Sequence, residues 1–400
     1  MKINRLTIAA YALFGAGVMV EICGCKEEEP QPQTAHISQL PSERTIGTIE
    51  VVTEFYDAMP AGVTVSRDGR IFVNYPRWGD TVPFTVGEVH DGKIAPYPNQ
   101  AMNTFDRGHP ANTLSSVQSV VVDPANRLWI LDTAAPNFST PSIGAAKLVA
   151  VDLATDQVVK TIVFPVSTVL PTTYINDVRL DLRKGKAGIA YITDSAHDGP
   201  GGIIVVDLAS GESWRKLSGH PSTAADPSFI PVVEGESLAV RSQGKAPLPV
   251  KAGADGIAIS FDGATLFYCP LSSRHLYSIP TALLLDRSVN DGTVARAVVD
   301  LGEKGASDGL ESDDKGRNYA GDYEHNSIRQ RQTDGVWKTI AHDPRILWPD
   351  TLSIASDGYL YFTANQLHRH ATFHNGEDER QKPYTLFRIR IDADQYYLNE

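Results

Sequence analysis

Cysteine is scarce in this chain: three occur, and two of them, Cys23 and Cys25, lie at the end of an apolar N-terminal stretch. The third, Cys269, lies in an apolar strand-like run. Processing of the chain at Cys25 would leave one further cysteine, so no intrachain disulfide could form. The sequence therefore predicts a fold held together by packing, with Cys269 as a small core residue.

Positive charge is also in short supply. Asp and Glu outnumber Lys and Arg by 48 to 36, which gives a formal net charge of -12 at pH 7. Nucleic-acid binding needs basic patches and none is visible in the sequence, so we expect no nucleic-acid partner. The acidic balance favours small cations or amines over anions as ligands.

Long hydrophobic runs are confined to the N-terminus. Residues 6–20 form an apolar stretch that follows two basic residues and is too short for a comfortable membrane span, which is typical of an export signal. Residues 22–25 resemble a bacterial lipobox, so we expect residues 1–25 to be a signal peptide with lipidation at Cys25. An acidic residue before the lipobox is unusual, and simple secretion or an uncleaved anchor is the alternative. The prediction is an exported cell-envelope protein whose membrane contact is this lipid.

The next segment, residues 26–45, is charged and rich in Gln and Pro, with no apolar period, and is predicted to be a solvated tether. No Pro/Gly/Ser-rich linker divides the chain after residue 45. We therefore expect one large domain over residues 46–400, present as a monomer and binding a small-molecule ligand.

Helical periodicity is almost absent, and residues 281–289 are the best short helical candidate. The chain instead contains a repeated segment. Each copy has a small or acidic opening, an alternating apolar strand, a polar turn and a second strand rich in aromatic or β-branched residues. Six copies occur, beginning at Pro60, Val117, Ile175, Ala254, Ser307 and Pro349. Self-similarity on this scale indicates a repeat architecture.

Further strand-like runs lie between these copies, at residues 145–153, 201–217, 274–280, 295–301, 336–341 and 384–392. Each copy can supply an inner hairpin and the runs after it an outer pair. Four-stranded antiparallel units repeated radially build a β-propeller, so we predict an all-β fold with six blades. Residues 46–56 precede the first copy and would close the ring by completing the last blade.

An aspartate stands at the opening of four copies: Asp177, Asp255, Asp308 and Asp350. The innermost strands of a propeller line its central channel, so these carboxylates are predicted to gather at one mouth. They would repel one another unless a cation, an amine or bound protons offset them. The pattern predicts a Ca²⁺-like site with oxygen ligands or a pocket for a small cation. The alternative is that each aspartate accepts backbone N–H bonds in a turn.

Seven segments carry a family resemblance: GRIFVNYPRW (69–78), NRLWILDTA (126–134), KLVAVDL (147–153), AYITDS (190–195), IIVVDLASGESWR (203–215), LFYCPLSSRHLYSIPT (266–281) and LWPDTLSIASDGYLYFTANQL (347–367). In combination they resemble the hallmark segments of the yellow/major royal jelly protein family. The resemblance implies a six-bladed propeller, in agreement with the repeats. It also implies one of two functions: isomerisation of a dopachrome-type quinone, or binding of aromatic amines in the central channel. Bacterial members of the family are often described as dopachrome-tautomerase-related.

The openings of the fourth and fifth copies are also similar to gluconolactonase-type propellers, which hold a divalent metal with a Glu, an Asn and an Asp. On that resemblance Asp308 matches the aspartate, Asp255 stands where the asparagine would be, and Asn176 could supply an amide oxygen. The glutamate has no counterpart, because the first copy opens at residues 60–62 with Pro, Ala and Gly. A metal-dependent hydrolase, with Ca²⁺ or another divalent cation, is therefore the alternative function.

Isomerisation of a quinone requires a general base and a proton donor with pKa values near the working pH. Crowding by other carboxylates could raise the pKa of Asp308 or Asp350 into that range, and His325 or His197 could act as donor or base. The alternative for either histidine is an exposed loop residue.

Arg77 and Trp348 are predicted to hold an anionic or aromatic ligand near the channel. The alternative is that the aromatic residues pack between blades. Three histidines within residues 368–374 could bind a transition metal or belong to an ordinary loop. No nucleophile motif of the GxSxG type occurs.

Overall fold

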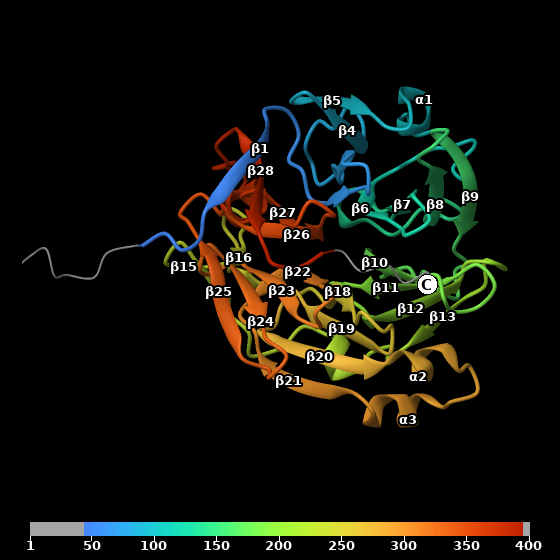
Figure 1. The fold of residues 1–400 in the computed structure, drawn as a ribbon. Coiled ribbons are helices and arrows are strands. Elements are labelled where there is room, and N and C mark those ends of the chain that lie inside the picture. The colour runs from blue at the N-terminus through green and yellow to red at the C-terminus, as the bar shows by residue number, and fades with distance from the viewer. Residues whose placement is uncertain (1–43, 395–400) are drawn as a thin grey trace, which may run out of the picture. The chain divides into compact units, whose positions relative to one another are not determined.

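The computed structural model describes residues 44–394, and the predicted signal peptide, Cys25 and the tether up to residue 43 lie outside the described residues. Within these residues, six four-stranded antiparallel sheets are arranged as the blades of a β-propeller (Figure 1). This confirms the predicted fold class. None of the described helices is long and apolar enough to cross a membrane.

The first three blades follow the chain in order, each from its innermost to its outermost strand. Blade 1 is β2 (Val63–Val65), β3 (Ile71–Asn74), β4 (Val86–His90) and β5 (Lys93–Pro96). Blade 2 is β6 (Val117–Val122), β7 (Arg127–Asp132), β8 (Lys147–Asp152) and β9 (Gln157–Val163). Blade 3 is β10 (Ile175–Asp181), β11 (Ile189–Asp194), β12 (Gly202–Asp207) and β13 (Ser213–Lys216).

Blades 4 and 5 have the same strand order, and the outermost strand of blade 6 is the N-terminal strand β1 (Ile49–Phe55). Blade 4 is β18 (Ala254–Ile259), β19 (Thr265–Pro270), β20 (His275–Pro280) and β21 (Val299–Glu303). Blade 5 is β22 (Ser307–Ser312), β23 (Asn318–Asp322), β24 (Ser327–Arg331) and β25 (Trp337–His342). Blade 6 is β26 (Pro349–Ile354), β27 (Tyr359–Ala364), β28 (Tyr384–Arg390) and β1 (Ile49–Phe55).

The ring closes through β1, which pairs antiparallel with β28 from Ile49 opposite Ile389 to Phe55 opposite Tyr384. This confirms the prediction that an N-terminal strand completes the last blade. The innermost strands contact one another in the cyclic order β2, β6, β10, β18, β22, β26 and back to β2. Their first residues therefore meet at one mouth of the central channel.

Apolar side chains packed between neighbouring blades form the core. Trp129 and Leu131 of blade 2, for example, pack with Ile192 and Ile204 of blade 3, and all four are fully buried. Burial of one such side chain contributes about 1.5–3 kcal/mol. The alternating apolar pattern of the repeats is thus explained by contacts between blades.

The polar turn of each repeat also has a structural role. Asp123 accepts backbone N–H bonds from Ala125 and Arg127 and a 2.7 Å bond from the Trp129 indole. In blade 5, Asp313 likewise accepts backbone N–H bonds in its turn and a 2.7 Å bond from the Tyr319 hydroxyl. These carboxylates satisfy the turn and orient the aromatic residue of the second strand.

The remaining elements lie in the connections between strands. The short helices are α1 (Gln100–Asn103), α2 (Thr281–Leu285), α3 (Asp291–Arg296) and the 3₁₀ turns Pro136–Phe138, Pro221–Thr223, Leu367–Arg369 and Ala371–Phe373. Between blades 3 and 4, β14 (Val232–Val233) pairs with β15 (Glu236–Ser237), and β16 (Ala239–Val240) with β17 (Leu248–Pro249). The predicted helix at 281–289 begins at Thr281 but ends at Leu285.

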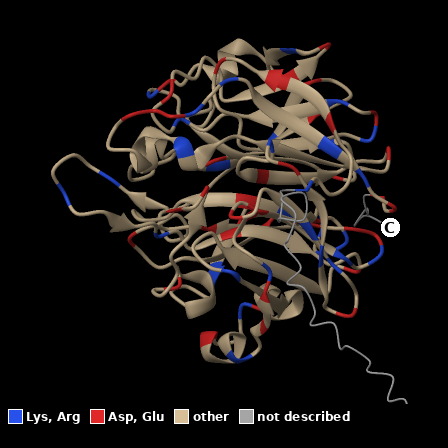
Figure 2. Ribbon diagram, turned by 90° about the vertical axis from the view of Figure 1, so that its left-hand side faces the viewer, with Lys and Arg blue, Asp and Glu red and all other residues tan. Residues whose placement is uncertain are grey.

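Charged residues of both signs are scattered over the ribbon in Figure 2.

Candidate functional site

A β-bulge at the start of the innermost strand occurs in five of the six blades. Strand register shifts directly after the first paired residue of β6, β10, β18, β22 and β26. A bulge leaves a residue unpaired and re-aims its side chain. The residues that follow the first pair are Gln118, Asn176, Asp255, Asp308 and Asp350.

This register corrects one assignment made from the sequence. The sequence pattern places Asp177 with Asp255, Asp308 and Asp350, yet Asn176 occupies the equivalent position and Asp177 lies one residue further along β10. The sequence pattern matches the copies at their carboxylate residues. The structure shows instead that equivalent positions are set by the strand pairing around each bulge.

Asp255 and Asp308 are buried, at 4% and 8% exposure, and their carboxyl groups are neighbours at the channel mouth. Burial, and then the neighbouring Asp308 carboxylate, raise the pKa of Asp255 well above its ordinary value. Burial also raises the pKa of Asp308, although a 2.8 Å bond from the Trp348 indole opposes that shift.

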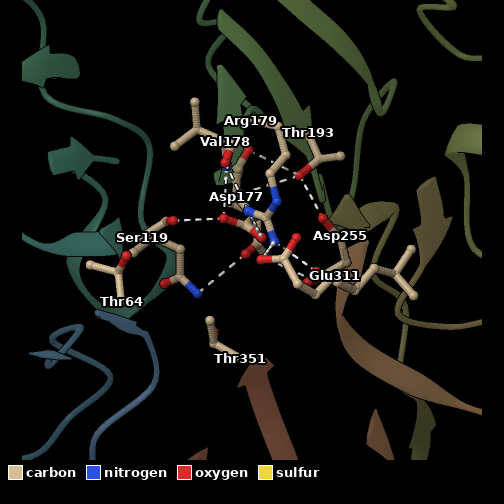
Figure 3. Close-up of polar contacts among 12 residues, drawn as sticks. Thr64, Ser119, Asp177, Val178, Arg179, Thr193, Asp255, Glu311 and Thr351 are labelled. Atoms are coloured by element: carbon tan, nitrogen blue, oxygen red, sulfur yellow. Dashed lines mark hydrogen bonds and ion pairs between the residues drawn. The ribbon is translucent and has the colours of Figure 1, made fainter. Parts of the chain in front are cut away.

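Asp350 and Asp177 lie at the same mouth but have different partners. Asp350 accepts a 2.7 Å bond from the Asn365 amide, and burial followed by the Asp308 charge raises its pKa well above the ordinary value. Asp177 accepts a 2.6 Å bond from the Ser119 hydroxyl and forms a 3.0 Å ion pair with Arg179 (Figure 3). Neither is among the residues that line the cavity described below.

Arg179 places a guanidinium in the channel, three residues beyond Asn176 on β10 (Figure 3). It donates to the Val178 and Leu310 carbonyls at 2.8 and 2.6 Å, and Glu311 lies 3.7 Å away. The positive charge of Arg179 offsets the negative charges of Asp177 and Glu311, which both lie on strands that line the channel. Within residues 44–394, the side chains that donate hydrogen bonds to Asp255, Asp308 and Asp350 are neutral: Asn176, Trp348, Thr351 and Asn365.

A cavity of about 320 Å³ opens above the Asp255–Asp308 pair. Its walls come from the loops and blade connections around the channel mouth. The lining residues are Trp78, Gln118, Phe138, Tyr174, Asn176, Ser195, His197, Asp198, Val240, Val250, Lys251, Ala252, Asp255, Leu271, Asp308, Trp348, Leu367, His370, Thr372 and Phe373. The cavity therefore combines a carboxyl floor with largely apolar and aromatic walls.

The aromatic residues form a connected wall. The Phe138 ring lies 5.5 Å from Trp78, 5.0 Å from Tyr174 and 4.9 Å from His197, between ring centroids. The Trp78 indole donates to the Tyr174 hydroxyl at 2.7 Å, which in turn donates to Gln118 at 2.8 Å. This chain of bonds links the wall to the bulged residue of blade 2.

Two wall residues have strained backbones. Phe138 has φ of 56° and Trp348 has φ of 57°, in the left-handed region that bulky residues rarely adopt. Trp348 is also held by stacking on Tyr323 at 4.1 Å. Strain of this kind costs of order 1–3 kcal/mol per residue and is concentrated at functional sites. The strained pair supports the cavity as the functional site.

His197 lines the cavity with a side chain that is exposed at its edge, and desolvation by the surrounding protein lowers its pKa, which favours the neutral imidazole. In the described structure its ring nitrogens have no hydrogen-bond partner, although the ring contacts Phe138 and Tyr174. A neutral imidazole with available nitrogens can accept or donate a proton.

The structure does not bring His325 or Arg77 to the cavity. His325 is 71% exposed and contacts Asp322 at 3.0 Å. Arg77 donates to the Ser115 and Val82 carbonyls and so holds two loops together. Trp348, in contrast, lines the cavity, and its contact with a ligand stays a prediction.

The three histidines of residues 368–374 have separate partners. His368 contacts Glu234 at 2.8 Å, His370 contacts Thr372 at 3.0 Å and His374 contacts Glu379 at 3.2 Å. In the described residues, the one group of three close metal-type side chains is Asp322, Glu324 and His325. Arg274 already binds Glu324 through two bonds, at 2.6 and 2.8 Å.

The donor set implied by the gluconolactonase resemblance does not fit. Asn176 directs its amide nitrogen, not its oxygen, at Asp255, at 2.6 Å. In blade 1, Gly62 offers no side chain, and Asn74 fills the adjacent space so closely that a Cβ at residue 62 would lie 2.0 Å from its Oδ1. A metal would have to turn the Asn176 amide before these residues could bind it.

The repeat pattern in the sequence does not identify three residues of the cavity wall, Phe138, Tyr174 and Gln118. Gln118 carried a detectable signal, because it follows the opening residue of its repeat as Asp255 does in blade 4. Phe138 and Tyr174 lie outside the repeats, in connections whose paths depend on contacts between blades.

Comparisons with known proteins agree with this architecture. A family model described as "Major royal jelly protein" matches residues 115–393. Protein yellow from Drosophila erecta and from Drosophila melanogaster are each 27% identical over 249 residues, 58% of this chain and 43% of the relative. The matched region thus spans less than half the length of these relatives.

Solved structures with a similar fold have low sequence identity. A luciferin-regenerating enzyme has a TM-score of 0.53 at 11% identity over 88% of this chain and 98% of its own. A calcium-binding regucalcin from Agrobacterium tumefaciens has 0.50 at 14%, over 87% and 97%. A gluconolactonase from Xanthomonas campestris has 0.51 at 10%, over 87% and 95%. At such identities these structures support the fold alone.

Proposed function

The chain belongs to the major royal jelly protein family, and on that basis we propose that its channel mouth binds a small aromatic amine in the ammonium form. One observation carries the proposal: the buried Asp255–Asp308 carboxyl pair forms the floor of an aromatic-walled cavity. The ammonium group binds at the carboxyl pair and the ring packs against the wall.

The physical chemistry of the cavity supports a cation with a flat apolar body. Neighbouring buried carboxyls favour a positive charge that offsets their repulsion. Trp78, Phe138 and Tyr174 supply ring faces, which attract cations and stack on aromatic rings. A volume of about 320 Å³ is at the lower end of the range for small-molecule sites.

Calorimetry with tyramine and its neutral analogue 4-hydroxyphenylethanol tests this function. Tyramine is expected to bind at least about tenfold more tightly, because the two ligands differ in the ammonium group that meets the carboxyls. Equal affinities, or no binding of tyramine, serotonin or dopamine, would contradict the proposal. A rise in Tm with millimolar Ca²⁺, together with loss of tyramine binding, would assign the carboxyls to a metal instead.

A tautomerase-like reaction on a dopachrome-type quinone is the second candidate, supported by His197 in the same cavity. The neutral imidazole would remove the proton from the carbon that bears the substrate carboxylate, and the protonated member of the Asp255–Asp308 pair would donate a proton to a quinone oxygen. The rearrangement is redox-neutral and needs no further reactant.

This second candidate predicts different effects of two histidine substitutions on dopachrome decay. His197→Ala is expected to lower the protein-dependent rate by about 10²-fold, the typical contribution of a general base. His325→Ala, a matched change outside the cavity, should leave the rate unchanged. The reaction is ruled out if the wild-type protein gives no rate above the spontaneous one, or if both variants behave alike.

A further inference from the structure

The cavity lining includes an exposed basic residue that the proposed function does not use. The 217–253 connection between blades 3 and 4 contributes Val240, Val250, Lys251 and Ala252 to the wall. Lys251 is the one Lys or Arg among the described lining residues. Its side chain is exposed, whereas Asp255 and Asp308 are buried, so the lining combines a solvent-exposed positive charge with a buried carboxyl pair.

The backbone on both sides of Lys251 is fixed by one buried serine. The Ser272 hydroxyl donates to the Val250 carbonyl at 3.0 Å and accepts from the Ala252 N–H at 3.1 Å. The Ser272 N–H in turn donates to the Ala252 carbonyl at 3.3 Å. Ser272 follows β19 of blade 4 and is 1% exposed, so the cavity edge at Lys251 is anchored to a blade. A lysine set on an anchored backbone loses less freedom on binding than one on a loose loop.

The Lys251 ammonium has no ion pair or hydrogen bond within residues 44–394. Asp198 is the other exposed charged residue of the lining, and no ion pair forms between the two. Asp198 also lines a neighbouring hollow of about 150 Å³, together with Phe138 and His197, whereas Lys251 does not. The positive charge of Lys251 is therefore available to a ligand in the main cavity.

We propose that Lys251 forms an anion subsite, so that the preferred ligands carry an ammonium group and a carboxylate or similar oxyanion on opposite sides of an aromatic ring. This inference rests on the proposed amine-binding function, because the carboxyl floor sets the orientation of the ligand. The ammonium binds at Asp255 and Asp308, the ring lies against the aromatic wall, and the oxyanion meets Lys251.

Benzylamine and 4-(aminomethyl)benzoate form a matched pair of probes, because they differ in one carboxylate placed across the ring from the ammonium. Calorimetry on the wild-type protein is expected to show about fivefold tighter binding of 4-(aminomethyl)benzoate, in the range of a partly exposed ion pair. Lys251→Met should remove this preference, so that the two probes bind the variant with similar affinities. Lys245→Met, an exposed lysine in the β16–β17 turn outside the cavity lining, should retain it.

Three results would overturn the inference. Equal affinities of the wild-type protein for the two probes exclude an anion subsite, while amine binding itself survives. A preference that persists in Lys251→Met assigns the anion to another group. Absence of binding by both probes overturns the amine-binding function as well, and is thus distinguishable from failure of the subsite alone.

Discussion

Asp308→Asn is expected to weaken tyramine binding by about 30-fold or more, and Asp255→Asn by a similar factor. Each substitution removes a buried carboxyl that faces the ligand ammonium, and loss of one partner of a buried charge pair costs about 2–5 kcal/mol. The double variant should bind tyramine no better than it binds 4-hydroxyphenylethanol. Calorimetry measures the affinities, and circular dichroism checks that the propeller is intact.

Asp350→Asn is the matched control, because Asp350 occupies the same bulge position and is equally buried but does not line the cavity. We expect at most a few-fold loss of affinity, caused by its long-range charge. If Asp350→Asn weakens binding as strongly as Asp308→Asn, the carboxyls act through their summed field, and the assignment of the ammonium to the Asp255–Asp308 pair is wrong.

Lys147→Met is expected to have the largest effect on stability. Lys147 and Asp132 form a 2.8 Å ion pair in which both side chains are fully buried. Asp132 also accepts backbone N–H bonds from Ser115, Ser116 and Ala134, so its charge cannot reach water when the ammonium is removed. An uncompensated buried carboxylate of this kind costs about 3–5 kcal/mol. Thermal unfolding should show a fall in Tm of roughly 5–10 °C.

Lys216→Met provides the comparison for this stability effect. Lys216 is also buried, but its ammonium donates to the Asp286 and Val289 carbonyls rather than to a carboxylate. Its loss should lower the free energy of unfolding by less. The double variant Lys147→Met, Asp132→Asn should recover part of the loss because no unpaired charge is left. Equal effects of the two single lysine variants would contradict this account of Asp132.

The repeat pattern predicted the blades because each inner hairpin is encoded locally, by alternating apolar residues and a turn carboxylate such as Asp123 or Asp313. The closing strand was predictable for a similar reason, since a propeller edge needs a partner. The site was predicted only in part. Asn176 could not be told from Asp177, because a bulge is set by pairing with β11 rather than by residue type.

Tyr174 shows why the residues of the cavity wall cannot be predicted from the repeat pattern. Its backbone N–H donates to Asp194 at 2.9 Å, and Arg215 holds the same carboxylate at 2.8 Å. The position of this wall residue thus depends on the ends of two other strands. Contacts of that kind leave no local period in the sequence.

The pairing of β1 with β28 has a consequence for how the protein folds. Glu50 lies opposite Arg388, so the ring joins one of the first strands to be synthesised to the last strand of the final blade. Closing a loop of this length is slow, because its entropy is lost before the contacts form. During synthesis β1 therefore has no partner until the chain beyond residue 384 emerges. Until then, the nascent chain exposes an unpaired strand at each end, which makes this interval the one most open to aggregation or to capture by a chaperone.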